Sequence, residues 1–221
     1  MSATPASREA VGPRYDLDTI RRAQARSWLA LERIAAIVRP GMRESEVHEA
    51  GRAVLAELGM EMSWHPLLIR FGANTLKIFS DRSQGDAVLA GDDIFFIDMG
   101  PVFDSHEGDV GATFTVGDDP EMKACAAASK QLFERVRTIW NAGAVTGSAL
   151  YDRAAQEALA MGWELNLDIR GHRVSDYPHS VHKGGNLGDF EAVPGKGLWI
   201  LEIQIRHPTR PFGAFYEDLL V

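Results

Sequence analysis

Cysteine is almost absent from this sequence, which has a single one, Cys125, among its 221 residues. An intrachain disulfide is therefore excluded, and the reducing environment of the cytoplasm suits such a chain. Long apolar runs are also missing. No stretch reaches the ~18 residues that a membrane-spanning helix needs, so we expect no membrane partner. Residues 1–15 lack the apolar centre of a signal peptide, and we expect them to form a disordered tail.

An excess of basic residues is missing as well. Asp and Glu number 31 against 23 Lys and Arg, which gives a formal net charge of −8. A chain without a basic stripe does not suit a nucleic-acid partner, whereas metal cations fit an acidic chain. Hydrophobic residues make up 45% of the sequence. A chain of this length buries roughly 70% of its unfolded surface, so we expect a globular fold without covalent staples.

Hydrophobic periodicity and helix-capping signals predict an α+β protein. Helices are expected over residues 18–38, 45–58, 120–141 and 148–161, and strands over 66–71, 94–99, 110–116, 165–169, 197–206 and 215–221. The segments beginning at Glu32 and Glu134 both start with Glu-Arg, and Gly41 and Gly143 keep the same offset of 102 residues. The repeat predicts two pseudo-symmetric halves in one domain, residues 16–221, with a cleft between them. Chance similarity of amphipathic helices is the alternative.

Two aspartates mark a predicted hairpin in the first half. Asp98 lies inside the apolar strand IFFIDMG, where a bare carboxylate is costly unless it is paired or bound to a metal. Asp109 opens the next strand, DVGATFTV, eleven residues later. A turn centred between residues 103 and 104 places Asp98 directly opposite Asp109. Their Cβ atoms are then about 5 Å apart, and like charges at that distance destabilise the pair. A divalent cation between them removes the repulsion.

The C-terminal segment repeats this arrangement with glutamates. Glu202 lies in the apolar strand LWILEIQIR and Glu217 in FYEDLLV, and the turn between them, HPTRPFG, is centred near their midpoint. His172, beside a predicted strand, adds a nitrogen donor. Four carboxylates and one imidazole suit Mn, Fe, Co or Zn, and a carboxylate that spans two ions gives a two-metal site. Pairing of Glu217 with Arg206 or Arg210 across the hairpin is the alternative.

Taken in order, these residues resemble the metal ligands of the family of methionine aminopeptidases, prolidases and aminopeptidases P. The resemblance covers roughly residues 18–221 and is carried by FIDMG, GDVGATFTVG, GH, LEIQI and YEDLLV. It implies the pita-bread fold, a pseudo-two-fold repeat of helices packed on a curved antiparallel sheet. It also implies a metallopeptidase of the aminopeptidase or dipeptidase type, with two divalent ions and a homodimeric assembly.

The resemblance assigns roles to individual residues. Asp98, Asp109 and Glu217 are expected to bind or bridge one ion, and His172 and Glu202 to complete the second. Glu202 is also expected to take a proton from the attacking water. His179, seven residues after His172, matches a family histidine that contacts the substrate carbonyl and stabilises the oxyanion. His182 follows three residues later and is assigned to substrate binding with it. His65, His106 and Trp64 match no motif and are interpreted as surface, supporting or core residues.

The sequence also departs from the family pattern. A cleft histidine usually stands about eighteen residues before the first aspartate, where this chain has Ser80, and Asp168 stands where aminopeptidase P relatives often have another histidine. The expected reaction is hydrolysis of a C–N amide bond in an Xaa-Pro or other small peptide. Because the cleft residues differ, a hydrolase of non-peptide amides or amidines and a non-catalytic pita-bread binding protein are the alternatives.

Overall fold

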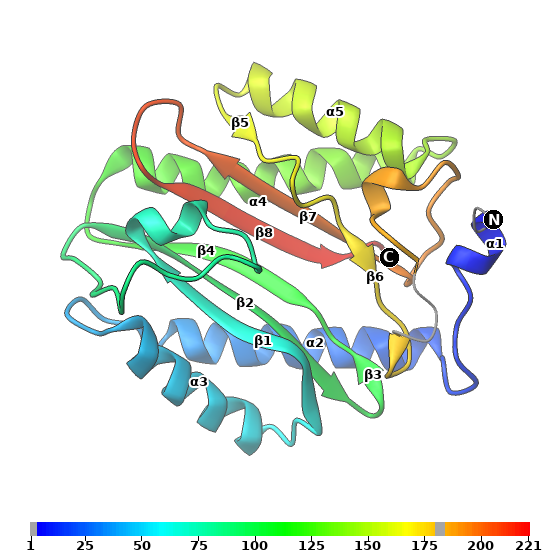
Figure 1. Ribbon diagram of the computed structural model, residues 1–221, viewed down its shortest axis with the longest axis horizontal. Coiled ribbons are helices and arrows are strands. Elements are labelled where there is room, and N and C mark those ends of the chain that lie inside the picture. Colours follow the sequence, from blue (N-terminus) through cyan, green and yellow to red (C-terminus); the bar gives the residue numbers. More distant parts are fainter. Residues whose placement is uncertain (1–3, 180–183) are drawn as a thin grey trace.

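The computed structural model describes residues 4–179 and 184–221, which form an eight-stranded antiparallel sheet flanked by helices (Figure 1). The main path of the sheet runs β1–β2–β4–β8–β7–β5, and two short strands join it, β3 beside β2 and β6 beside β7. The strands are β1 (Met62–Phe71), β2 (Asp93–Phe103), β3 (His106–Glu107), β4 (Val110–Val116), β5 (Glu164–Leu165), β6 (His172–Arg173), β7 (Trp199–Arg206) and β8 (Gly213–Leu219).

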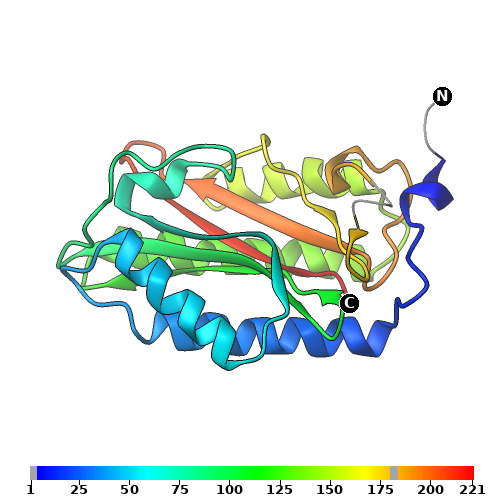
Figure 2. The same ribbon diagram turned by 60° about the horizontal axis from the view of Figure 1, so that its bottom comes forward.

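Four long helices cover one side of the sheet and its outer edges (Figures 1 and 2). They are α2 (Leu17–Ala35), α3 (Glu44–Glu57), α4 (Pro120–Asn141) and α5 (Gly147–Ala160); the short segments are α1 (Pro5–Arg8), η1 (Gly72–Leu76) and η3 (Leu187–Asp189). Asp16 caps α2 by accepting from the Thr19 N–H, and Asp119 caps α4 just before Pro120. No helix within the described ranges is long and apolar enough to cross a membrane.

The predicted repeat is visible in the topology. The first half, α2 to β4, and the second half, α4 to β8, each run as helix, helix and then strands from the outer edge of the sheet to its centre. Helix α2 packs on β2 and β4, and α4 packs on β7 and β8. Strands β4 and β8 meet at the centre, where Gly111 pairs with Glu217. The site expected between the halves therefore has one strand of each half at its floor.

The first hairpin has a different register from the one predicted. Phe103 pairs with His106, so the loop contains only Asp104 and Ser105, whose φ angles are 50° and 56°. A two-residue hairpin loop favours positive φ at both positions, because that backbone matches the twist of the strands. The centre of the turn thus lies one residue later than expected. Asp98 pairs with Gly111 and not with Asp109. The predicted direct opposition of the two aspartates is wrong.

Residues 4–15, expected to be disordered, lie against the second half of the chain in this structure. Arg8 donates to the backbone carbonyls of residues 186 and 189, and Glu9 accepts from the Trp199 indole at 2.6 Å. Asp176, which is buried, accepts from the backbone N–H groups of Gly12 and Arg14. These hydrogen bonds to charged side chains hold the segment in place, although its composition resembles that of a free tail.

Candidate metal centre and cleft

The site is built on a row of residues that crosses the centre of the sheet. Asp98 on β2 pairs with Gly111 on β4, Gly111 with Glu217 on β8, and Glu217 with Glu202 on β7. The predicted opposition of Glu202 and Glu217 is confirmed. A Cβ atom at Gly111 would lie 2.4 Å from the Phe215 ring and 3.0 Å from Glu217 Oε1. Glycine therefore allows the Phe215 ring and the Glu217 carboxylate to pack directly against the β4 backbone, where a side chain would displace them.

Asp109 lies two residues before Gly111 in the chain, just ahead of β4. It is fully buried, and Gln24 of α2 fixes its backbone by hydrogen bonding to both its N–H and its carbonyl. The Gln24 side chain also donates to Asp218 Oδ1, beside Glu217, at 2.7 Å. The Gln24 side chain on α2 therefore links Asp109 in the first half to Asp218 in the second half. These hydrogen bonds help to fix the position of Asp109 relative to Glu217.

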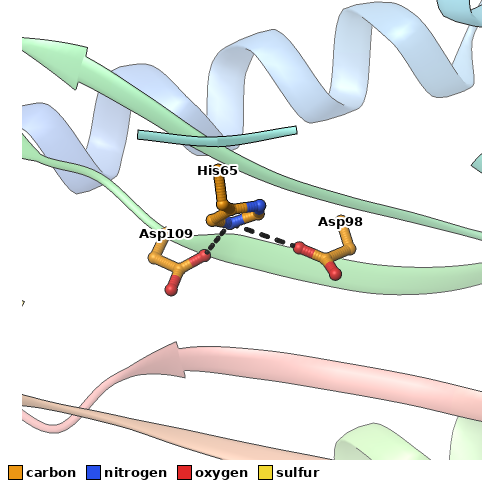
Figure 3. Close-up of side chains that lie close together, drawn as sticks. All are labelled: His65, Asp98 and Asp109. Atoms are coloured by element: carbon orange, nitrogen blue, oxygen red, sulfur yellow. Dashed lines mark hydrogen bonds and ion pairs between the residues drawn. The ribbon is translucent and has the colours of Figure 1, made fainter. Parts of the chain in front are cut away.

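Two histidines face the two oxygens of Asp109. His172 Nε2 lies 3.0 Å from Asp109 Oδ2, as the predicted ligand set requires. His65 Nε2 lies 2.9 Å from Asp109 Oδ1 and 3.6 Å from Asp98 Oδ1 (Figure 3). Four of the predicted ligands, Asp98, Asp109, His172 and Glu217, thus gather at one place together with His65, which the sequence motifs did not include. The fifth, Glu202, lies opposite Glu217 on the adjoining strand.

His65 was interpreted from the sequence as a surface or supporting residue; its side chain is only 19% exposed and lies against Asp98 and Asp109, so the surface alternative is wrong. His65 lies on β1, which begins four residues earlier than the predicted strand, and it pairs with Gly100 on β2, two residues beyond Asp98. A Cβ atom at Gly100 would lie 2.2 Å from the His65 ring. The signal that could have identified His65 was therefore the glycine of FIDMG, combined with extension of the first strand through Trp64.

The buried charges have opposing effects on protonation. Burial raises the pKa values of Asp98 and Glu202 and raises that of Glu217 well above its usual range, with neighbouring carboxylates adding to the rise. Burial also acts on Asp109, but the two imidazoles outweigh it and lower its pKa to about 2. Burial lowers the pKa values of the histidines, yet the carboxylates raise that of His65 to about 9 and that of His172 to about 10.

These residues fit a metal centre. Within the described part of the chain, buried Glu217 Oε1 has no hydrogen-bond partner, and Asp109 Oδ2 has only the ion pair with His172 at 3.0 Å. An unpaired buried carboxylate oxygen is costly, and a cation satisfies it. Two groups of donor atoms are close enough to hold an ion, one formed by His65, Asp98 and Asp109, the other by Asp109, His172 and Glu217. Asp109 belongs to both, and the set of oxygen and imidazole donors suits borderline divalent cations.

A second polar cluster lies beside the metal centre. His179 Nδ1 is 2.7 Å from Glu107 Oε2, and the His179 backbone N–H donates to Glu107 Oε1 at 2.8 Å. Glu107 is completely buried. The Trp64 indole packs edge-on against His65, His172 and His179, at centroid distances of 4.6, 5.4 and 4.9 Å. Trp64, interpreted from the sequence as core, is therefore a wall of the site.

A largely apolar cleft adjoins Asp98 and Glu202. Its lining is supplied by β1, by the segment after η1, by β2, β7 and β8, and by the loop before β6. In addition to the two carboxylates it comprises Leu68, Lys77, Ile78, Phe79, Phe96, Ile169, Gln204 and Phe215. Phe79 is 74% exposed. Ser80, where a family histidine was expected, is exposed next to Phe79. The family pattern has a histidine at position 80, whereas in this chain the Phe79 ring borders the cleft.

Other predicted contacts have clear outcomes. Arg206 pairs with Glu164 at 2.5 Å and Arg210 with Asp119 at 2.7 Å, so neither forms the alternative ion pair with Glu217. Asp168 is exposed and its backbone N–H bonds to Asn166 Oδ1, outside the metal centre. His182 lies outside the described residues.

Two pseudo-symmetric helix–strand halves around a buried carboxylate and histidine cluster define a pita-bread protein with a metal-binding centre. The chain belongs to metallopeptidase family M24, whose family model matches residues 18–221. A search of curated proteins gave no match.

Solved structures with this fold include peptidases of several kinds. An X-Pro aminopeptidase from Thermotoga maritima superposes with a TM-score of 0.77 at 21% identity, covering 96% of this chain and 59% of that one. A prolidase from Pyrococcus furiosus gives 0.78 at 19% identity, with coverages of 96% and 62%. A methionine aminopeptidase from Thermotoga maritima gives 0.71 at 16% identity, with coverages of 97% and 92%. The chain thus spans about three fifths of the first two structures and nearly all of the third.

Proposed function

We propose that this protein is a metal-dependent hydrolase that cleaves an amide bond in a small peptide, with an Xaa-Pro peptide as the first substrate to test. The observation that carries the proposal is the convergence of Asp98, Asp109, Glu202 and Glu217 around Gly111, with two imidazoles beside them. Four buried carboxylates without bound cations repel one another. Membership of family M24 supports the same conclusion.

Asp98, Asp109, His172, Glu202 and Glu217 would hold two divalent ions, Mn, Co, Fe or Zn. The ions would polarise the scissile carbonyl and make a water molecule nucleophilic at neutral pH. Glu202 borders the cleft, and its Oε2 accepts from the Gly171 N–H at 2.8 Å. It is half-buried, whereas Asp109 and Glu217 are almost completely covered. This exposure supports the proposed role of Glu202, which would take the proton of the attacking water and return it to the leaving nitrogen.

His179 is proposed to bind the substrate carbonyl oxygen. Its Nδ1 lies 2.7 Å from Glu107 Oε2, so the ring is held with Nε2 directed away from that carboxylate. An N–H at Nε2 would donate to the oxyanion that develops on the substrate carbonyl. Glu107 therefore acts as a positioning residue for His179.

The cleft lining supports an apolar side chain next to the scissile bond. Phe96 and Phe215 pack with a centroid distance of 5.3 Å at the floor, and Phe79 stands at the rim. Proline and other apolar side chains gain free energy from such a surface. The same lining and the exposed Ser80 also favour a second candidate, a hydrolase of small non-peptide amides.

The test is a parallel measurement of metal content and hydrolysis. Purified protein is loaded with Mn or Co and assayed with Xaa-Pro dipeptides, other dipeptides and small amides. We expect about two equivalents of metal and hydrolysis that chelation abolishes, and both should be lost in Asp98→Ala. Retention of metal and activity by that variant contradicts the proposal. Metal-free protein without any metal-stimulated hydrolysis favours a non-catalytic binding protein.

A further inference from the structure

We propose that His65 is a metal ligand, which completes one cation position with Asp98 and Asp109 beside the position formed by Asp109, His172 and Glu217. This inference rests on the proposed metal-dependent function and deepens it. None of the sequence motifs that resemble the family's ligands lies on β1. The assignment comes only from where β1 places His65 in this chain (Figure 3).

The distances suit ligands of one ion. Atoms bound about 2.0–2.2 Å from a metal lie about 3.0–3.5 Å from one another in tetrahedral or octahedral geometry. His65 Nε2 is 2.9 Å from Asp109 Oδ1 and 3.6 Å from Asp98 Oδ1. The corresponding separation for the predicted ligand His172, from Nε2 to Asp109 Oδ2, is 3.0 Å. His65 thus stands in the same relation to Asp109 as a predicted ligand does.

The second ring nitrogen fixes the tautomer. His65 Nδ1 lies 2.9 Å from the carbonyl oxygen of Pro66, and His172 Nδ1 lies 3.1 Å from that of Arg173. Because a carbonyl only accepts, Nδ1 carries the hydrogen in both rings, and the Nε2 lone pair of the neutral ring faces the carboxylates. Histidines that bind metals characteristically donate their other N–H to a backbone carbonyl or a carboxylate in this way.

The surroundings hold the His65 ring in this orientation. Gly100, its partner on β2, leaves the space that the ring occupies, since a Cβ atom there would lie 2.2 Å from His65 Cδ2 and 2.6 Å from Trp64 Nε1. Trp64 packs against the ring edge-on, and its indole N–H donates to the Gly108 carbonyl at 3.0 Å. The imidazole is therefore confined from two sides next to the carboxylates of Asp98 and Asp109.

A histidine at each position changes which metals the centre prefers. A position formed by carboxylates alone suits hard cations such as Mg and Ca, whereas imidazole favours Zn, Co and other transition ions. With His65 on one side of Asp109 and His172 on the other, both positions have one nitrogen donor. We therefore expect both to prefer transition metals over Mg.

The test measures cobalt binding by the whole protein, using equilibrium dialysis with elemental analysis and the visible absorption of bound Co. Four proteins are compared: wild type, His65→Ala, His65→Gln, and His48→Ala as a control that removes a half-buried histidine on α3, outside both groups of donor atoms. We expect about two equivalents for wild type and His48→Ala. Both His65 variants should retain about one, with the second ion bound at least ~10-fold more weakly.

The glutamine variant separates a ligand from a structural residue, because its amide can still hydrogen-bond to Asp109 but is a poor donor to Co. Two tightly bound equivalents in His65→Gln overturn the inference, whatever His65→Ala does, and leave the proposed function intact. Absence of cobalt from wild type and His48→Ala overturns both. Circular dichroism of the metal-free variants checks that they fold.

Discussion

The two halves of the molecule share one topology but contribute different residues to the site. The first half contributes His65, Asp98 and Asp109, and the second half contributes His172, Glu202 and Glu217. In the second half the two carboxylates are directly opposite each other across the β7–β8 hairpin. In the first half the partner of Asp98 is Gly111, and the second aspartate comes two residues earlier, before β4 begins.

This difference explains how one sheet can hold a buried charged cluster. A symmetric arrangement would place a fourth carboxylate at position 111, directly opposite Glu217 on the adjoining strand. With glycine there, the Glu217 carboxylate and the Phe215 ring occupy the position of the missing side chain. The asymmetry follows from where each turn is centred: between Asp104 and Ser105 in one hairpin, and between residues 209 and 210 in the other. The centre of each turn therefore sets the register of its hairpin and with it the geometry of the centre.

The largest expected effect comes from neutralising the carboxylate that lies next to Gly111. Glu217→Gln should remove most metal binding and lower kcat/KM by roughly 1,000-fold or more, because Glu217 is a proposed ligand at the junction of the halves. The metal-free variant should be at least as stable as wild type, since burial raises the pKa of Glu217 and its charge opposes folding. Elemental analysis, kinetics and thermal melts of chelated protein provide the measurements.

Glu121→Gln is a matched control for that variant. Glu121 pairs with Arg210 on the surface, and its loss should leave metal content and kcat/KM unchanged. Wild-type metal content in Glu217→Gln would show that the second half does not contribute a ligand from β8, and the comparison between the halves would then fail.

The next largest effect is a pH dependence of the stability of the metal-free protein. The raised pKa values of Asp98, Glu202 and Glu217 mean that, above about pH 4, the unfolded chain has released protons that the folded chain still holds. The free energy of unfolding therefore falls as the pH rises. His65 and His172 act in the same direction, since their contribution is complete below about pH 6.5 and is lost as the pH rises through about 9 and about 10.

Thermal melts of chelated protein between pH 5 and 9 measure this slope. We expect the melting temperature to fall by several degrees across the range and the gain on adding Mn to grow with pH, because metal requires deprotonated ligands. The low pKa of Asp109, about 2, has the opposite sign, but its contribution is complete above about pH 3.8 and adds no slope here. A melting temperature that rises with pH in EDTA contradicts the description of the cluster.

The second half was easier to predict from sequence than the first, and the reason is local. The strand around Glu202 and the strand around Glu217 flank a turn whose centre follows from its Pro and Gly residues, so their opposition could be computed. In the first hairpin the turn residues, Asp104 and Ser105, admit more than one centre, and a shift of one residue moved Asp98 from Asp109 to Gly111.

Contacts between segments that are far apart in the chain could not be predicted from the sequence. His65 enters the centre only because β1 pairs with β2 in a register interrupted by bulges near His65. Glu107 meets His179 across a gap of 72 residues, and a buried glutamate two residues before Asp109 carried no periodic signal. The resemblance predicted a set of candidate ligands, whereas long-range strand pairing decided which other groups lie beside them.

A smaller effect is expected from the cluster that accompanies Asp109. Glu107→Gln should lower kcat roughly 10- to 100-fold with little change in KM, because His179 would lose the carboxylate that orients its ring while the metal centre remains. A loss confined to kcat is the expected sign of a misoriented ring, whereas a packing defect alone would change KM and stability as well. Glu61→Gln is the control, since Glu61 holds the same hairpin from its exposed side through the Ser105 N–H. Equal losses in both variants would assign Glu107 a structural role.

The smallest effect tests the cleft, where the halves also differ. The first half supplies Phe79 to the cleft lining, and the second half supplies Ile169. Phe79→Ala should raise KM about 3- to 10-fold for substrates with proline or another apolar side chain, and less for glycine substrates, since the lost surface contacts only the side chain. Because Phe79 is 74% exposed, the melting temperature should change little. Leu159→Ala, which removes a 65% exposed side chain on α5 away from the cleft, controls for loss of surface apolar area. An equal rise in KM for glycine and proline substrates would mean that Phe79 acts on the backbone or the metal centre, and the apolar lining would then not select the substrate.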